Sequence, residues 1–436
     1  MTSRTPVRDR LEAAFERIDD PEGEGNTTFL HVSRERARAA ADAADQRARL
    51  DVPLSPLDGA LVSIKDLFDV RGERTTAGSL LRSDAALAEQ DAPVVARLRA
   101  AGAVLVGRTN LSEFAFHGLG TNPHYGTPRN PADRTRVPGG SSSGAAVSVA
   151  GDMCEIGIGT DTAGSVRIPA AFCGLVGFKP TQERIPRTGV FPLSTTLDSV
   201  GPLAKTVERA YCVDAVMAGL EPAPLRPCDP ARLRVGLVRG EPLEGLDETV
   251  ANAFTDALDA LGANGVRLRD IDLPMLAHLT EVTRIAGFSS TEMFRRHKAD
   301  VETERRQLYD PFVLSRIERG RTVTAAQYLD MLDHRRTGIA AMAEVFTEID
   351  LLVLPATPIV APRFEELTTI EVCLNLNAQL LRNEIIANFF DLCAITLPIP
   401  QTGPPAGLLL MARHGADRQL FAAASVVESW LARRAK

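Results

Sequence analysis

The feature of this sequence that most limits its fold and chemistry is a stretch rich in glycine and serine between residues 138 and 181. It reads PGGSSSGAAVSVAGDMCEIGIGTDTAGSVRIPAAFCGLVGFKPT. Glycine permits positive φ and close backbone approach, and serine supplies hydroxyl groups. Apolar residues alternate through the stretch and continue into predicted helix and strand, which argues against a flexible linker. Phosphate-binding loops require GxxxxGKS, GxxxxGKT or GxGxxG, and none of these patterns occurs here, so the stretch indicates serine chemistry.

One candidate within this stretch is the pentapeptide GSSSG at 140–144, which matches the GxSxG nucleophile elbow of α/β-hydrolases with Ser142 at its apex. An elbow requires a strand immediately before it, whereas residues 134–138 are charged and end in proline. It also requires a downstream histidine. The downstream histidines lie in mostly polar helical surroundings that predict exposure to solvent: His278, His297, His334 and His414. An α/β-hydrolase esterase is therefore the less favoured interpretation.

Short apolar runs alternate with helical patterns along the chain, which predicts an α/β fold with a sheet covered by helices on both faces. Strands are predicted at 60–64, 104–106, 156–158, 175–178, 233–238, 266–268 and 350–354, and helices at 93–101 and 144–150. Residues 1–50 predict an N-terminal helical layer, and residues 276–346 a helical cover over one side of the sheet. A length of 436 residues suits two or three domains, but large sheet-based enzymes often form one, and we expect a single domain over 1–436.

Charge and cysteine content argue against several function classes. The net charge of −7 argues against a nucleic-acid surface, because phosphate binding needs clustered Lys and Arg. The six cysteines include no CxxC pair, which argues against a metal site or disulfide scaffold and favours reduced thiols. The N-terminus lacks the apolar region of a signal peptide, and no apolar run approaches the ~18 residues of a membrane span. We expect a cytoplasmic protein that binds no metal, cofactor, nucleic acid or membrane.

Motifs on both sides of the Gly/Ser stretch, in a fixed order, resemble those of the amidase signature family, serine hydrolases that use a Ser–cis-Ser–Lys triad. The matching blocks are PLDG at 56–59, VSIKD at 62–66, RTNLSEFA at 108–115, TPRNP at 127–131 and LDSVGPL at 197–203. The resemblance implies one large amidase-signature domain with a central mixed β-sheet covered by helices on both faces. It places the signature core at 56–210 and a variable cover over the substrate site at 276–346.

By position in these motifs, the resemblance implies that Ser165 is the nucleophile, Ser141 the bridging serine and Lys65 the base. A serine hydroxyl is a weak nucleophile until a neighbouring base takes its proton. Lysine can act as that base only if burial lowers its pKa from about 10.4. Lys65 follows the apolar run at 60–64, which predicts its burial. The family holds the bridging serine through a cis peptide bond, here Gly140–Ser141.

Two of these residues, Lys65 and Ser141, also have a purely structural interpretation. Outside the motif, Lys65 and Asp66 would indicate a surface ion pair. Ser141 would suit the N-cap of the helix predicted at 144–150, a role that Ser142 or Ser143 can take instead.

The resemblance also implies the groups around the reacting carbonyl. The backbone N–H groups of Thr162, Ala163, Gly164 and Ser165 are the expected oxyanion hole. Ala163 departs from the family, which commonly has glycine there, and resembles the variant in allophanate hydrolases. Alanine tolerates positive φ poorly, so we expect ordinary backbone geometry at this position.

Five further residues near the motifs are candidates for support or binding. The resemblance implies that Ala115, Phe116 and His117 line the acyl side of the pocket. Asp161 either supports the Lys65–Ser141 network or caps a turn. Arg167 either binds a substrate carboxylate or has a structural role, and the structural role is favoured.

The favoured function is hydrolysis of a carboxamide C–N bond in a small molecule, with ester, carbamate or urea-type bonds as further candidates. The alternative is the A subunit of a tRNA-dependent amidotransferase, but residues 304–328 look more like hydrolytic amidases. A catalytically dead binding protein is disfavoured because all three triad positions are present. The expected partners are the amide substrate, water and a second copy of the chain in a homodimer. The few aromatic residues argue against a large lipid-binding channel.

Overall fold

The computed structural model describes residues 5–434 and contains one mixed sheet of eleven strands, in the order β1-β3-β2-β4-β6-β5-β10-β11-β9-β7-β8. The strands are β1 Phe29–Val32, β2 Leu61–Lys65, β3 Val104–Thr109, β4 Ile156–Asp161, β5 Val176–Lys179, β6 Ser199–Ala204, β7 Arg234–Val238, β8 Arg267–Ile271, β9 Leu351–Pro355, β10 Cys393–Ile399 and β11 Ala406–Ala412. Strand β2 pairs in parallel with β3 and β4, and β7 pairs in parallel with β8 and β9, whereas the other pairs are antiparallel. Strands from most of the length of the chain therefore join in this one sheet.

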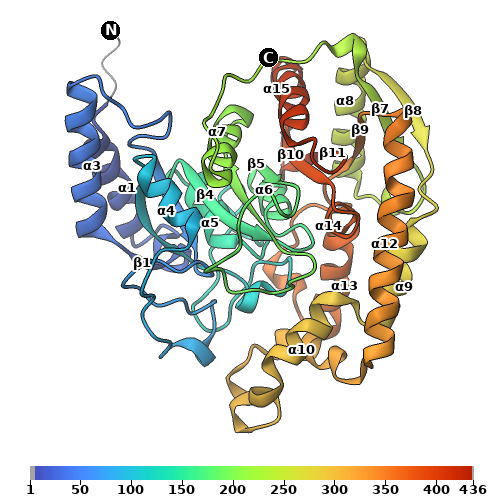
Figure 1. Cartoon of the computed structure of the whole chain (residues 1–436), viewed down its shortest axis with the longest axis horizontal. Coiled ribbons are helices and arrows are strands. Elements are labelled where there is room, and N and C mark those ends of the chain that lie inside the picture. The colour runs from blue at the N-terminus through green and yellow to red at the C-terminus, as the bar shows by residue number, and fades with distance from the viewer. Residues whose placement is uncertain (1–4, 435–436) are drawn as a thin grey trace.

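Helices surround this sheet (Figure 1). They are α1 Val7–Asp19, α2 Gly25–Thr28, α3 Arg34–Arg49, α4 Pro93–Ala100, α5 Ser143–Ala150, α6 Arg167–Cys173, α7 Val207–Ala218, α8 Glu248–Ala263, α9 Leu276–Ile285, α10 Gly287–Val301, α11 Pro311–Glu318, α12 Ala325–Glu348, α13 Ile370–Leu381, α14 Ile385–Phe389 and α15 Asp417–Arg434. Several begin at sequence signals. Pro93 occupies the first turn of α4, and Thr324 forms a capping box with Gln327 at the start of α12.

Alternate residues of the central strands pack into different layers, which shows that both faces of the sheet are covered. In β11, Leu408 and Leu410 join the core that contains α7, α8 and α15, whereas Leu409 and Met411 join the core that contains α6, α12 and α14. Strand side chains alternate with a period of two, so a strand that is apolar at every position must be buried on both faces. This arrangement confirms the predicted α/β class.

All seven predicted strands are confirmed, but four strands were not expected: β1, β6, β10 and β11. Residues 1–50 were expected to form a helical layer, of which residues 1–4 lie outside the described residues, and this expectation is wrong at Phe29–Val32. These four residues form an edge strand because they pair antiparallel with β3, and a local helical pattern carries no record of that pairing. Among residues 5–434, no helix is long and apolar enough to cross a membrane.

The two ends of the sheet carry different helices. Helices α1 and α3 lie at the β1 end, and α9 and α12 lie at the opposite end, beside β7 and β8 (Figure 1). Within the expected cover at 276–346, residues of α10 and α11 pack in the same core as Phe114 and Phe116. The cover therefore packs with the segment around Phe116, which the family resemblance places beside the substrate.

Close packing of α5 on β4 depends on a glycine in the strand. A Cβ atom added at Gly157 would lie 2.7 Å from the backbone oxygen of Ala145 in α5. No real Cβ approaches an oxygen this closely, so any other residue would push α5 away from the sheet.

We predict that Gly157→Ala lowers the free energy of unfolding by about 1–3 kcal/mol, because the added methyl group overpacks the α5–β4 contact. Denaturant-induced unfolding measures this loss. The matched control is Gly262→Ala in α8, where an added Cβ meets nothing within 4 Å. This control should keep or slightly raise stability, because alanine favours helix over glycine. Equal stability of the two variants would contradict the proposed packing role.

Candidate active site

Lys65 ends strand β2 and is completely buried among hydroxyl groups. Its Nζ lies 2.7 Å from Ser141 Oγ, 2.9 Å from Thr160 Oγ1 and 3.0 Å from Ser142 Oγ. Strand β4, which carries Thr160, pairs directly with β2, so the sheet itself brings Thr160 to the lysine. No ion pair of Lys65 with a carboxylate occurs among the described residues, so the alternative interpretation, a surface ion pair of Lys65 and Asp66, does not apply.

Burial lowers the pKa of Lys65 to about 7, although the negative charges of Asp161 and Asp198 oppose this shift. A neutral amine has two N–H donors and one lone pair. The three hydroxyl oxygens accept hydrogen bonds from Nζ, and when the amine is neutral one of these hydroxyls can instead donate to its lone pair. This lysine can accept a proton near neutral pH.

Ser141 lies on the loop before α5, and the Gly140–Ser141 peptide bond is cis. The backbone N–H of Ser112 donates to the oxygen of Ser141 (3.2 Å), and the N–H of Gly140 donates to the oxygen of Gly118 (2.8 Å). These two hydrogen bonds fix the serine loop to the segment at 112–118.

Ser165 lies between β4 and α6 and is buried. Its backbone oxygen accepts a hydrogen bond from the N–H of Ser142 (3.2 Å), the residue next to Ser141. The structure thus brings the loops of Ser141 and Ser165 together at the end of β2 that carries Lys65.

Asp161 fixes the loop that carries Ser165. Its Oδ1 accepts from the N–H of Gly164 (2.8 Å), and its Oδ2 accepts from the N–H of Val166 (3.1 Å). Burial by itself would raise the pKa of Asp161, but the positive charges of Arg167 and Lys179 hold it well below its usual range. Of the two roles considered for Asp161, the structure shows that it caps the turn, and it contributes to the Lys65 environment only through its charge.

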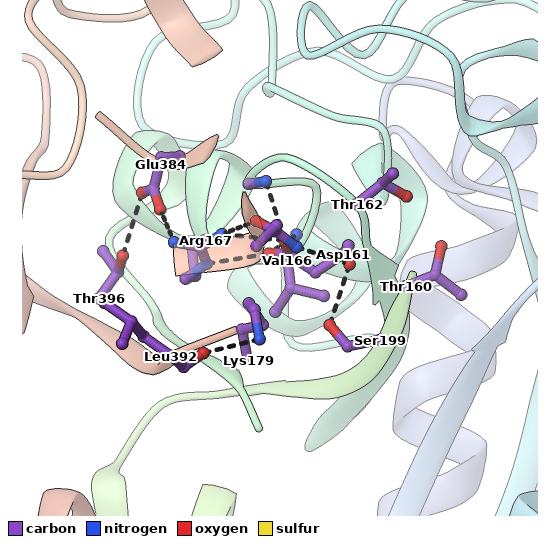
Figure 2. A network of polar contacts seen from close by, with 12 residues as sticks. Thr160, Asp161, Thr162, Val166, Arg167, Lys179, Ser199, Glu384, Leu392 and Thr396 are labelled. Carbon is purple, nitrogen blue, oxygen red and sulfur yellow. Dashed lines mark hydrogen bonds and ion pairs between the residues drawn. The ribbon is translucent and has the colours of Figure 1, made fainter. Parts of the chain in front are cut away.

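Arg167 is completely buried and surrounded by polar partners (Figure 2). It donates to both oxygens of Asp161 (2.9 and 3.0 Å) and to Asn388 Oδ1 (2.7 Å), and it forms an ion pair with Glu384. Burial raises the pKa of Glu384 to about 8, against the charge of Arg167. With its donors directed to these partners, Arg167 has the structural role that the sequence favoured.

The backbone of the Ser165 loop differs from expectation at one position. Gly164 has φ = 113°, and an added Cβ would lie 2.5 Å from the Cβ of Glu384, so glycine is required there. Its N–H donates to Asp161, which removes it from the expected oxyanion hole. Ala163 is not among the described residues that have positive φ, as expected for alanine. The amides of Thr162, Ala163 and Ser165 stay as candidate donors.

The three expected pocket residues, Ala115, Phe116 and His117, are all buried and follow the strand β3. Ser112 Oγ donates to the backbone oxygen of His117 (3.1 Å), which ties the segment to the residue that also holds Ser141. This hydrogen bond places the segment beside the serine loop.

A cavity of about 320 Å³ borders the Lys65 cluster on the side of Thr160. Asp198 also lines this cavity, and burial raises its pKa to about 6. Asp198 accepts a hydrogen bond from Thr162 Oγ1 (2.6 Å), so it connects the cavity wall to the Ser165 loop.

Sequence reasoning missed three residues of this site, Thr160, Glu384 and Asn388, and it gave Ser142 other candidate roles. Ser142 was one of two serines considered as the cap of α5, and it stands at the N-cap position, but its side chain makes no capping hydrogen bond and contacts Lys65 instead. Thr160 could have been identified if the strands predicted at 60–64 and 156–158 had been taken as neighbours in the sheet. No sequence signal identifies Glu384 and Asn388, because they reach the loop from more than 200 positions away.

The downstream histidines do not form a site with Ser142. His297 was expected to be exposed, but it is buried against Phe114 and hydrogen-bonds with Tyr309 (2.8 Å). In the part of the chain that the structure describes, His278 and His334 contact each other, and His414 contacts Asp391. These histidines contact residues other than Ser142, so the described residues give the elbow interpretation no support.

Comparison with known proteins gives a consistent result. The family model described as Amidase matches residues 9–421. The chain is 37% identical over 406 residues to 2-amino-5-chloromuconic acid deaminase of Comamonas testosteroni, covering 90% of this chain and 86% of that protein. It is 36% identical to the A subunit of glutamyl-tRNA(Gln) amidotransferase from Anaeromyxobacter sp. (strain K), covering 96% and 92%. A crystal structure of an amidase, 31% identical, superposes with a TM-score of 0.85 over 99% of this chain and 96% of that one. The protein therefore belongs to the amidase family of enzymes.

Proposed function

We propose that this enzyme hydrolyses a carboxamide C–N bond of a small molecule through an acyl-enzyme on Ser165, with Ser141 as proton relay and Lys65 as base. The observation that carries the proposal is the 2.7 Å contact between Lys65 Nζ and Ser141 Oγ inside a buried site. A lysine that is neutral near pH 7 is the base that such a relay requires.

In the proposed reaction, the neutral amine of Lys65 accepts the proton of Ser141 Oγ, and Ser141 accepts the proton of Ser165 Oγ. Ser165 Oγ then forms a bond to the carbonyl carbon, and the carbonyl oxygen becomes an oxyanion. Collapse of this intermediate breaks the C–N bond, and Ser141 returns a proton to the leaving nitrogen. A water molecule attacks the acyl-enzyme by the same proton route and restores Ser165.

Backbone amides are proposed to stabilise the oxyanion. The free candidates are the N–H groups of Thr162, Ala163 and Ser165, because the N–H of Gly164 donates to Asp161. Amides fixed before the reaction stabilise developing charge without reorganisation. The hydrogen bonds of Asp161 on both sides of Ser165 supply this rigidity.

The relatives support two different possibilities for the substrate and partners of this chain. The deaminase relative supports action on a small molecule, and the amidotransferase relative supports action within a complex. Autonomous hydrolysis is favoured because residues 304–328 resemble hydrolytic amidases. A reducing compartment such as the cytoplasm suits the six cysteines, which are all free thiols in the structure. Ester, carbamate and urea-type substrates stay predictions, as does a homodimer, which size-exclusion chromatography tests.

We predict that Ser165→Ala, Ser141→Ala and Lys65→Ala each lower kcat/KM for amide hydrolysis by on the order of 10³-fold or more, because each removes a step of the proton route. Steady-state assays with a panel of amides, ureas, carbamates and esters measure the effect. The matched control is Ser425→Ala in α15, whose hydroxyl donates only to its own helix, to the oxygen of Ala422. Full activity in Ser165→Ala together with loss of activity in His414→Ala would contradict the proposed triad.

We predict that kcat/KM rises about tenfold per pH unit below pH 7 and levels off above it. The neutral amine is the active form, and Lys65 has a pKa lowered to about 7, so protonation below that pH removes the base. A pH–rate profile measured where circular dichroism shows the fold intact checks this dependence. A flat profile from acid to neutral pH would exclude a lysine base.

We predict that the purified chain hydrolyses simple amides without a partner. The competing outcome is inactivity of the isolated chain with glutaminase activity that appears only beside a partner protein. That outcome would replace the autonomous hydrolase with a component of an amidotransferase.

A further inference from the structure

The peptide unit between His117 and Gly118 is held at both ends by buried side chains. Its oxygen accepts a hydrogen bond from Ser112 Oγ (3.1 Å), and its N–H donates to Asn377 Oδ1 (2.7 Å). Ser112 and Asn377 are both buried, so water does not compete for these contacts. Buried hydrogen bonds that act on one peptide group polarise each other. The backbone at this point is therefore fixed partly by a residue 259 positions away in the sequence.

The same backbone segment holds the loop of Ser141. The oxygen of Gly118 accepts a hydrogen bond from the N–H of Gly140 (2.8 Å), and the N–H of Ser112 donates to the oxygen of Ser141 (3.2 Å). One hydrogen bond lies on each side of the Gly140–Ser141 peptide group. The location of Ser141 therefore follows the location of segment 112–118.

Close packing leaves no slack between the two segments. An added Cβ at Gly140 would lie 2.7 Å from the Cα of Gly120 and 2.9 Å from Ser112 Oγ. The two backbones thus touch without room for a methyl group. Because a packed interior transmits strain, a shift of the segment after β3 would move Gly140 as well.

Asn377 reaches this segment from α13, which contacts α11 of the cover. Leu380, one turn further along α13, packs in the same apolar core as Leu119 and Phe312. A polar side chain in such surroundings costs free energy unless it is hydrogen-bonded. Its bond to the N–H of Gly118 satisfies this requirement and joins α13 to the chain of contacts that ends at Ser141.

We propose that Asn377 is a positioning residue that sets the location of Ser141 through Gly118 and Gly140. The inference rests on the proposed function in that Ser141 is taken as the proton relay. Ser141 Oγ lies 2.7 Å from Lys65 Nζ, and a misplacement of about 1 Å in such a site can lower the rate about 100-fold. Loss of the Asn377 contact would misplace the relay without removing any reacting group.

The test compares two substitutions in the full-length protein. Asn377→Leu keeps the branching of the side chain but removes the acceptor, whereas Asn377→Asp keeps an acceptor at the same place. We expect Asn377→Leu to lower kcat/KM for a hydrolysed amide by about 10- to 100-fold, because the N–H of Gly118 is left buried without a partner. Asn377→Asp should stay within about threefold of the unmodified protein.

The pH at which kcat/KM reaches half its plateau separates positioning from a mere loss of stability. The ammonium form of Lys65 donates to Ser141 Oγ, so withdrawal of this hydroxyl disfavours the charged form and lowers the pKa of Lys65. The charges of Asp161 and Asp198, which favour the ammonium form, are unchanged in the variant. We expect the midpoint of Asn377→Leu to move to lower pH, whereas partial unfolding would lower only the plateau.

The matched control is Asn264→Leu at the end of α8, which removes a hydrogen bond to the oxygen of Ala260 (2.8 Å) and should keep both the rate and the midpoint. Hydrogen–deuterium exchange adds a measurement that needs no hydrolysis. Asn377→Leu should speed exchange at 112–118 and 138–142 by about tenfold or more, and Asn377→Asp and Asn264→Leu should not. If Asn377→Leu does not fold, Asn377→Ala removes the acceptor without added volume and is measured in the same way.

The proposal is overturned if exchange at 138–142 is unchanged without the acceptor, or if kcat/KM falls with no shift of the midpoint. Amide hydrolysis by the unmodified protein is measured separately. If the unmodified protein hydrolyses no amide, the proposed reaction is rejected. Faster exchange at 138–142 that Asn377→Asp does not show would still support the contact that positions Ser141.

Discussion

The site depends on the burial of Lys65, which forms no ion pair with a carboxylate within residues 5–434. A charged ammonium in this position would carry a large desolvation cost, and only three hydroxyl oxygens are near enough to reduce it. The central sheet makes this burial possible, because Lys65 ends a strand that is paired on both sides. The same burial that destabilises the charged form makes the amine a base near neutral pH. The burial that results from the position of Lys65 in the sheet therefore also determines its chemistry.

A second buried network pairs opposite charges and fixes the loop of Ser165. Asp161 is charged, Arg167 compensates it, and Glu384 approaches from the other side with a raised pKa (Figure 2). These residues come from β4, the start of α6 and the segment before α14. The geometry around Ser165 therefore depends on contacts between the signature core and the C-terminal third of the chain.

Much of the fold could be predicted from sequence, because β2, β3, β4 and β5 are apolar runs between helical patterns. The edge strand β1 could not, since four residues become a strand only when β3 is beside them. The proposed catalytic positions Lys65, Ser141 and Ser165 follow from a family resemblance carried by motifs. Residues without a motif, such as Glu384 and Asn388, and the loss of the Gly164 amide to Asp161, depend on tertiary packing alone.

Lys65 and the serines lie on the sheet and its adjoining loops, whereas α10 and α11 of the cover pack with Phe114 and Phe116, so the proposed reaction and the recognition of substrate would depend on separate parts of the chain. Substitutions in α11 can change which molecule is accepted without moving the groups around Lys65. Selection could then diversify substrates in this lineage while the proton route is retained. The cover is accordingly the region in which related chains should differ most.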